Sequence, residues 1–255
     1  MYRYMVDSGT DPTARVVQYV MGLLERSAAV HGGDPAHRLR TEAKAHSLML
    51  DVDRHHLTPS EFTVNSYIGV CDASGGSGSM HLAAARVADY LSRHERQGSP
   101  GLYTRLLGGL LRHGHHAEAL ATVTTLQHTP LTNHLLNAVL QTARHSRDPS
   151  AAFAMYRAVL PASDRRALSD RPLRPSLHTM SILLEVMRET NDFAELDFVL
   201  REMKRYRLKG NGVLLNKILS ALLVCERRRE AQLLRTQMEA KHVVVFDELK
   251  RALDT

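Results

Sequence analysis

The sequence lacks tryptophan, and aromatic residues make up only 5% of its 255 positions. Cysteine is nearly absent: Cys71 and Cys225 lie far apart, each in an apolar stretch with helical spacing. This distribution is typical of small buried side chains in a reducing compartment rather than of a disulfide framework. No apolar run reaches the roughly 18 residues of a membrane-spanning helix, which predicts a soluble protein with no membrane partner.

The net charge and the first residues of the chain give less information about partner and location. Lys and Arg outnumber Asp and Glu by 33 to 27, and the net charge of +6 permits an anionic partner without requiring one. The first residues lack the apolar core of a secretory signal, and Asp7 and Asp11 make them a poor mitochondrial presequence. Either an unrecognised signal targets the protein or a presequence has been removed.

A pattern repeats five times along the chain. Each copy opens with a small polar residue flanked by apolar ones, at intervals of 39, 33, 44 and 35 residues: Asn65, Thr104, Asn137, Ser181 and Asn216. The two long intervals contain apparent inserts, the glycine- and serine-rich residues 75–79 and the proline-rich residues 161–175. Without these inserts the period is about 35 residues, which indicates a stacked array of repeats.

Each repeat has the spacing of two amphipathic helices joined by a short turn. Leu196, Val199, Leu200 and Met203, for example, form an i, i+3, i+4, i+7 stripe. The sequence therefore predicts an all-α, right-handed solenoid of antiparallel helical pairs. We expect a capping pair over 1–56, five repeats over 57–242 and a capping helix over 243–255. Helix starts are expected near Asp11, Asp34, Phe62, Leu102, Asn133, His178 and Val213.

The repeats resemble those of the pentatricopeptide repeat family. The openings PSEFTVNSYI (residues 59–68) and PSLHTMSILL (residues 175–184) are similar to the proline linker and helix start of that family. Gly114 followed by residues 118–120 is similar to its inter-helix turn, and residues 201–204 are similar to its closing motif. Tetratricopeptide repeats fit poorly, because the sequence has no tryptophan. The resemblance covers 57–242. The repeats are most similar to those of short, degenerate family members found in mitochondrial ribosomes and RNA-processing complexes.

The resemblance implies binding of single-stranded RNA, with one base contacted by two side chains of each repeat. Carried over, the pairs are Asn65 with Ser99, Thr104 with Thr132, Asn137 with Ser176, Ser181 with Asn211, and Asn216 with His242. Only Ser181 with Asn211 matches a defined family combination, one for a purine, adenine more than guanine. Helix capping is the competing explanation for these polar residues. Candidate phosphate contacts are Arg201, Lys204, Arg205, Arg207, Lys209, Arg227, Arg228 and Arg229.

No motif predicts catalysis, a cofactor or a metal site. His113, His115 and His116 lie in a predicted turn with no cysteine nearby in the sequence, and residues 75–79 lack the Lys-Ser/Thr of a phosphate-binding loop. We therefore expect no enzymatic activity, and the resemblance implies an RNA-associated scaffold of an organellar ribonucleoprotein in the mitochondrial matrix, with ribosomal or messenger RNA and protein subunits as partners. The ribosome is the favoured assembly. The alternatives are a protein-binding adaptor and a sequence-specific mRNA-maturation factor; a basic concave face favours RNA, and an apolar one a protein.

Overall fold

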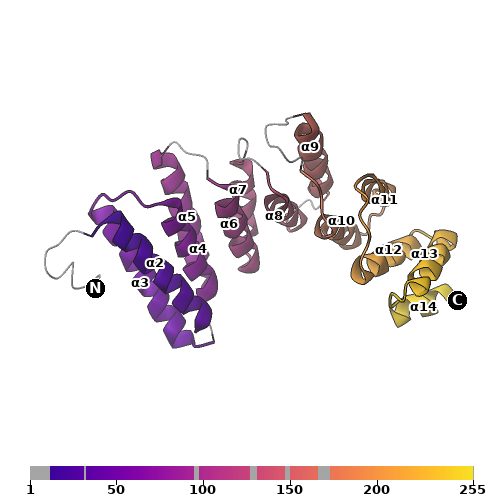
Figure 1. Ribbon diagram of the computed structural model, residues 1–255, viewed down its shortest axis with the longest axis horizontal. Helices are drawn as coiled ribbons and strands as arrows, with labels where there is room; N and C mark the ends of the chain where they lie inside the picture. Colours follow the sequence, from indigo (N-terminus) through magenta and orange to yellow (C-terminus); the bar gives the residue numbers. More distant parts are fainter. Residues whose placement is uncertain are drawn as a thin grey trace. The chain divides into compact units, whose positions relative to one another are not determined.

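Thirteen helices and no strand make up the described residues of the computed structural model, which are 12–31, 33–94, 98–126, 131–146, 150–165 and 173–254 (Figure 1). The all-α prediction is confirmed. The predicted helix starts agree with the structure to within three residues. None of the described helices is both long and apolar enough to cross a membrane.

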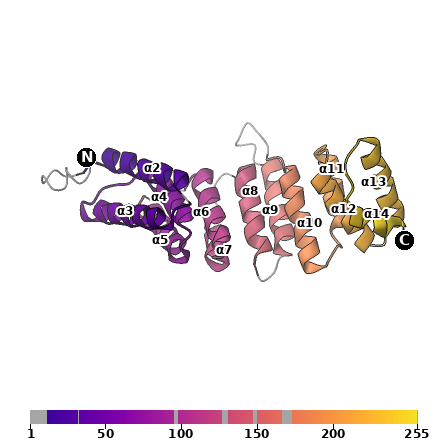
Figure 2. The same ribbon diagram turned by 90° about the horizontal axis from the view of Figure 1, so that it is seen from below.

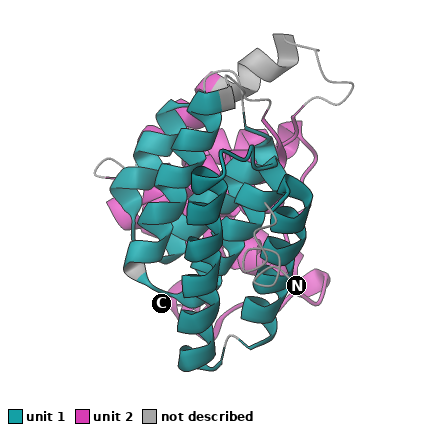
Figure 3. Cartoon of the chain, turned by 90° about the vertical axis from the view of Figure 1, so that its left-hand side faces the viewer, with its two compact units in different colours: residues 1–130 teal, residues 131–255 magenta. Residues whose placement is uncertain are grey.

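The chain divides into two compact units, unit 1 (Met1–Pro130) and unit 2 (Leu131–Thr255), coloured teal and magenta in Figure 3. Unit 1 contains α2 (Ala14–Val30), α3 (Pro35–Arg54), α4 (Glu61–Ser74), α5 (Ser77–His94), α6 (Pro100–Arg112) and α7 (His116–Thr124). The first helices of its three pairs, α2, α4 and α6, pack on one another in series (Figure 2). Each second helix, α3, α5 or α7, packs against its own first helix.

Unit 2 repeats this arrangement. It contains α8 (Asn133–Arg144), α9 (Ala151–Arg165), α10 (Leu177–Thr190), α11 (Leu196–Arg205), α12 (Gly212–Val224), α13 (Arg228–Ala240) and α14 (Asp247–Asp254). Helices α8, α10 and α12 pack in series, and α14 closes the stack against α12 and α13. One core cluster runs through the unit and includes Leu140, Tyr156, Leu183 and Leu219, all almost completely buried. A single pair could not bury these side chains, so the stacking of pairs supplies the core.

A polar residue starts the first helix of every predicted repeat. Side-chain oxygens of these N-caps accept hydrogen bonds from the backbone N–H groups three residues later, and the caps are Ser60, Ser99, Thr132, Ser176 and Asn211. At the other end, Asn191 closes α10 with a φ angle of 51°, in the left-handed region that asparagine tolerates. The boundaries are thus fixed by local capping chemistry, and the predicted period follows from it.

The first of the two predicted inserts needs correction. Residues 75–79 are no flexible insert: Gly75 ends α4 with a φ of 73°, and α5 begins at Ser77. Ser79 is buried and its hydroxyl donates to the carboxylate of Glu42 on α3, which holds this turn against the stack. The extra length lies in α5 itself. The second insert, residues 161–175, was expected to be a loop with at most one short helical turn, and α9 extends into it as far as Arg165. Residues 166–172 of that insert lie outside the described residues.

Candidate nucleic-acid interface

The candidate base-contacting residues of the first helices share one register. Each lies five positions after its N-cap, as Asn137 does after Thr132 and Ser181 after Ser176. The residue three positions before each candidate lies on the same helix face and is exposed wherever it carries a side chain: Phe62, His134, His178 and Val213. Sequence reasoning did not single out this second column. Its signal is the recurring aromatic or apolar residue just after the cap.

The closing members of the predicted pairs are committed to capping. Ser99 Oγ accepts from Leu102 N at 3.2 Å, and Thr132 Oγ1 accepts from Leu135 N at the same distance. Asn211 Oδ1 accepts from Leu214 N at 2.9 Å. Ser176 forms a full capping box with Thr179. His242 differs, because it is exposed and lies in the turn after α13 with a φ of 56°. Four of the five closing residues therefore satisfy helix N-termini.

Asn216 does not fit the predicted base contact. The residue is only 2% exposed, and its amide is fully used within the chain. Its Nδ2 donates to Val244 O at 2.9 Å and to Gly212 O at 2.8 Å, and its Oδ1 accepts from Phe246 N at 3.0 Å. These bonds clamp residues 243–246 and so position α14. The sequence alone could not reveal this, because the partners are about 30 residues further along.

The other candidate base-contacting residues differ in whether their polar side-chain atoms have hydrogen-bond partners within the chain. Asn137 Oδ1 accepts from Thr179 Oγ1 at 2.7 Å and so joins α8 to α10. Thr104 Oγ1 donates back to Pro100 O of its own helix at 2.7 Å. Asn65 differs from both, because its Oδ1 is buried and has no hydrogen-bond partner in the described structure.

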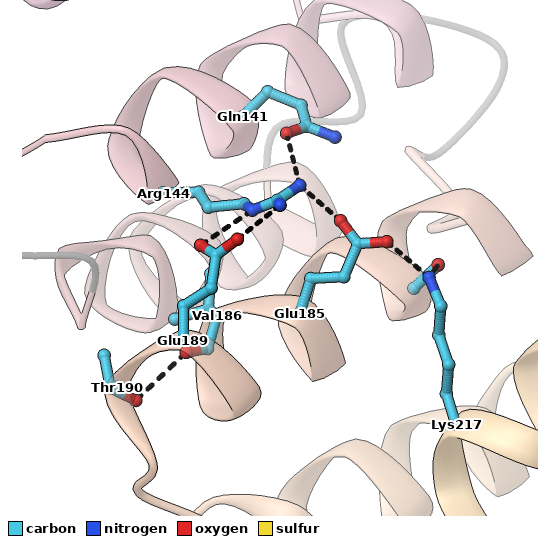
Figure 4. A network of polar contacts seen from close by, with 8 residues as sticks. Gln141, Arg144, Glu185, Val186, Glu189, Thr190 and Lys217 are labelled. Carbon is cyan, nitrogen blue, oxygen red and sulfur yellow. Dashed lines mark hydrogen bonds and ion pairs between the residues drawn. The ribbon is translucent and has the colours of Figure 1, made fainter.

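A network of charged groups joins the three first helices α8, α10 and α12 (Figure 4). Ser181 takes part in it, because its hydroxyl oxygen accepts from Lys217 Nζ of α12 at 2.6 Å. Lys217 also pairs with Glu185, which in turn pairs with Arg144 of α8. Arg144 Nε donates to Glu189 at 2.9 Å, and this guanidinium holds the pKa of the Glu189 carboxyl below its usual value. Ser181 is thus engaged in joining α10 to α12.

The phosphate candidates also fall into two groups. Arg227 is held by two carboxylates, Asp197 at 2.6 Å and Glu230 at 2.7 Å, and these hydrogen bonds raise its pKa. Arg205 lies 3.5 Å from Glu202 and stacks over the ring of Tyr206. The other candidates are exposed and have no partner within the described structure: Arg201, Lys204, Arg207, Lys209, Arg228 and Arg229.

Unit 2 is electrostatically asymmetric. Among its described side chains, every carboxylate except those of Glu226 and Glu248 has a hydrogen-bond or ion-pair partner. Many cations do not, and the unpaired set also contains three exposed residues outside the predicted phosphate contacts, Arg174, Arg188 and Lys241. The uncompensated charge on the surface of unit 2 is therefore predominantly positive.

Comparisons with known proteins find similarity in the fold but not in the sequence. No protein-family model matches the sequence, and no curated protein matches it. The structure is similar to the PPR domain of Arabidopsis thaliana protein-only RNase P 1, which was crystallised with tRNA. That match has a TM-score of 0.55 and 15% identity over 73% of this chain and 93% of the other.

A second solved structure, PPR10 in complex with an 18-nt psaJ RNA element, covers 99% of this chain but only 42% of PPR10. Its identity is 15% and its TM-score is 0.39, too low to carry an argument. This chain thus spans less than half the length of PPR10. The first match is enough to show that the helical pairs form a pentatricopeptide-repeat-like fold, as the sequence predicted.

Proposed function

We propose that this protein is an RNA-associated helical-repeat scaffold, without catalytic activity of its own, in a mitochondrial ribonucleoprotein, with the ribosome as the favoured assembly. The observation that carries the proposal is the charge asymmetry of unit 2, where most of the described carboxylates have partners within the chain and many exposed cations have none. Exposed Lys and Arg side chains of this kind supply the phosphate contacts that dominate nucleic-acid affinity. The organelle is inferred from the resemblance of the repeats to organellar pentatricopeptide proteins. The solved neighbour in complex with tRNA supports RNA as the partner class.

A scaffold fits the site better than a base reader does. A reader needs free donors and acceptors in each repeat to discriminate one base edge from another. Here the one pair that matches a family combination, Ser181 with Asn211, already has partners within the chain. Ser181 accepts from Lys217, and Asn211 caps α12. Asn216 is buried and clamped. The exposed rings of Phe62, His134 and His178 remain available for stacking, which tolerates any base.

The proposal predicts how binding depends on salt. The double variant Arg228→Ala/Arg229→Ala removes two unpaired cations from α13. It should flatten the slope of log affinity against log salt by about 1.4 for single-stranded RNA, about 0.7 per lost phosphate contact. The control Arg227→Ala/Arg235→Ala removes the same formal charge from the same helix region, but from side chains already paired with carboxylates.

Fluorescence anisotropy of the full chain with 20-mers of poly-U, poly-A and mixed sequence would measure both slopes. We expect the first variant to weaken binding to all three RNAs alike. The control should change the slope of log affinity against log salt much less. Equal effects of the two variants, or no RNA binding by the parent chain, would refute the proposed phosphate contacts. Crosslinking and sequencing of bound RNA from purified mitochondria would distinguish ribosomal RNA, messenger RNA and no RNA.

A further inference from the structure

The second helices of unit 1 expose an apolar, uncharged face. On α7, all of the exposed residues are uncharged: Ala117, Leu120, Ala121 and Thr124. On α5, the exposed positions include Leu82, Ala85, Ala88 and Ser92, and on α3 they include Leu39, Ala43, Ser47 and Leu50. The four leucines are 66% (Leu39), 57% (Leu50), 48% (Leu82) and 37% (Leu120) exposed. We call this surface of α3, α5 and α7 the leucine–alanine face.

Side-chain contacts join the three helices. Asp53 of α3 pairs with Arg86 of α5, and Glu118 of α7 lies 3.0 Å from His81 of α5. Figure 2 shows the three helices along the same side of unit 1. Arg93, near the end of α5, forms ion pairs with Asp89 at 2.8 Å and with Asp53. Among the described side chains of α5 and α7, no charge without a partner therefore interrupts the face.

This composition is unusual for the water-facing side of a helical pair. The outer positions of a surface helix are normally polar or charged, and a helix that is apolar all round is normally buried. Helix α11, which has the same place in its repeat in unit 2, follows the rule, since its exposed side carries Asp197, Arg201, Lys204 and Arg205. Helix α7 does not. Contiguous exposed apolar surface of this kind marks a binding site for another protein.

The charges at the margin indicate what covers the face. Arg40 and Lys44 are exposed on α3, one turn apart, and neither has a partner within the described structure. A second copy of this chain would bring its own excess positive charge, because the net charge is +6. RNA is no better as the occupant, since the described side chains of α5 and α7 offer its phosphates no cation that lacks a carboxylate partner.

We infer that the leucine–alanine face docks an amphipathic helix of a partner protein, with its apolar stripe on α5 and α7 and acidic residues along the edge that meets Arg40 and Lys44. Leucines separated by small alanines form the ridges and grooves into which such a helix packs. The site differs from the proposed RNA contacts, none of which lies on α3, α5 or α7. Acidic residues at the rim give orientation and partner choice, and the apolar contacts give most of the affinity.

The test uses the full chain and two fluorescent peptides of about 18 residues, each with a Leu stripe at i, i+3, i+4 and i+7. One peptide carries Glu along a single flank, and the other carries Lys at the same positions. We expect the Glu peptide to bind at least about tenfold more tightly than the Lys peptide. Arg40→Glu/Lys44→Glu should reverse this preference.

The variant Leu82→Asp/Leu120→Asp should weaken binding of the Glu peptide at least about tenfold, since it places charge in the centre of the contact. Leu233→Asp is the control, a leucine on α13 of unit 2 that is 64% exposed and should change nothing. Circular dichroism checks that every variant keeps its helicity. Sedimentation velocity tests for a second copy as the occupant.

Three results would overturn the inference. The first is that neither peptide binds, or that both bind equally. The second is that Leu233→Asp weakens binding as much as the paired substitution on α5 and α7. The third is self-association of the parent chain that Leu82→Asp/Leu120→Asp abolishes, which would assign the face to a second copy.

Discussion

The clamp formed by Asn216 gives the sharpest test of whether the polar column is structural. Asn216→Ala removes the acceptor of Phe246 N–H and the donor to Val244 C=O, and it leaves a small cavity in a position that is 2% exposed. A buried polar group left without a partner costs about 1 to 3 kcal/mol. The side chains of Val244 and Phe246 are largely exposed, so water can replace part of what is lost. The net cost should then be about 2 kcal/mol, borne mainly by residues 243–246 and α14.

Hydrogen exchange measures this cost where it arises. A destabilisation of about 2 kcal/mol corresponds to an opening equilibrium about 30-fold larger, so the Phe246 amide should exchange about 30-fold faster. The exchange rates of the α10 amides should change little, because α14 packs mainly against α12 and α13. Mass spectrometry of peptic fragments covering 240–254 gives the comparison.

Asn65→Ala is the matched control, because Asn65 holds the same register in α4 but its Oδ1 has no partner. Its effect on stability should stay within about 0.5 kcal/mol. If Asn216→Ala leaves the exchange of the Phe246 amide unchanged, the clamp does not hold the segment. If it instead removes preference for one RNA base at unchanged stability, Asn216 is a base-contacting residue after all.

Three further predictions concern individual side chains. Arg144 lowers the pKa of Glu189, so the pair stabilises the fold above the ordinary carboxyl pKa of about 4.3 and loses this effect as the pH falls. Arg144→Met should therefore lower stability at pH 7 by about 1 kcal/mol, with a difference that shrinks below pH ~4 in urea titrations; a pH-independent difference would contradict the assignment. Thr132→Ala should cost about 1 kcal/mol because it removes the cap of α8, whereas Thr104→Ala, which removes only a bond to its own helix, should cost clearly less in thermal unfolding. Burial raises the pKa of the Cys71 thiol to about 12, so at pH 8 DTNB should modify the half-buried Cys225 first and Cys71 only on unfolding, and the reverse order would show that Cys71 is accessible.

Much of the fold was predictable because its signals are local. Amphipathic spacing placed the stripe of α11, and Leu196, Val199 and Met203 are indeed buried there. Polar residues before apolar runs placed the helix starts, and Ser60 and Ser176 prove to be caps. The first insert was misjudged because its sequence was judged from local signals alone. Residues 75–79 look flexible in isolation, and only the buried contact of Ser79 with Glu42 of another helix orders them.

The sequence by itself determined the period, the helical pairs and the column of small polar residues, because propensity, capping and hydrophobic spacing act within a few turns of helix. Only the tertiary structure decided what that column and the arginines do. Ser181 meets Lys217 across 36 residues, and Arg227 meets Asp197 across 30. Whether a polar side chain is free to bind a ligand depends on which distant donors, acceptors and charges stacking brings beside it. That neighbourhood exists only once the first helices have packed.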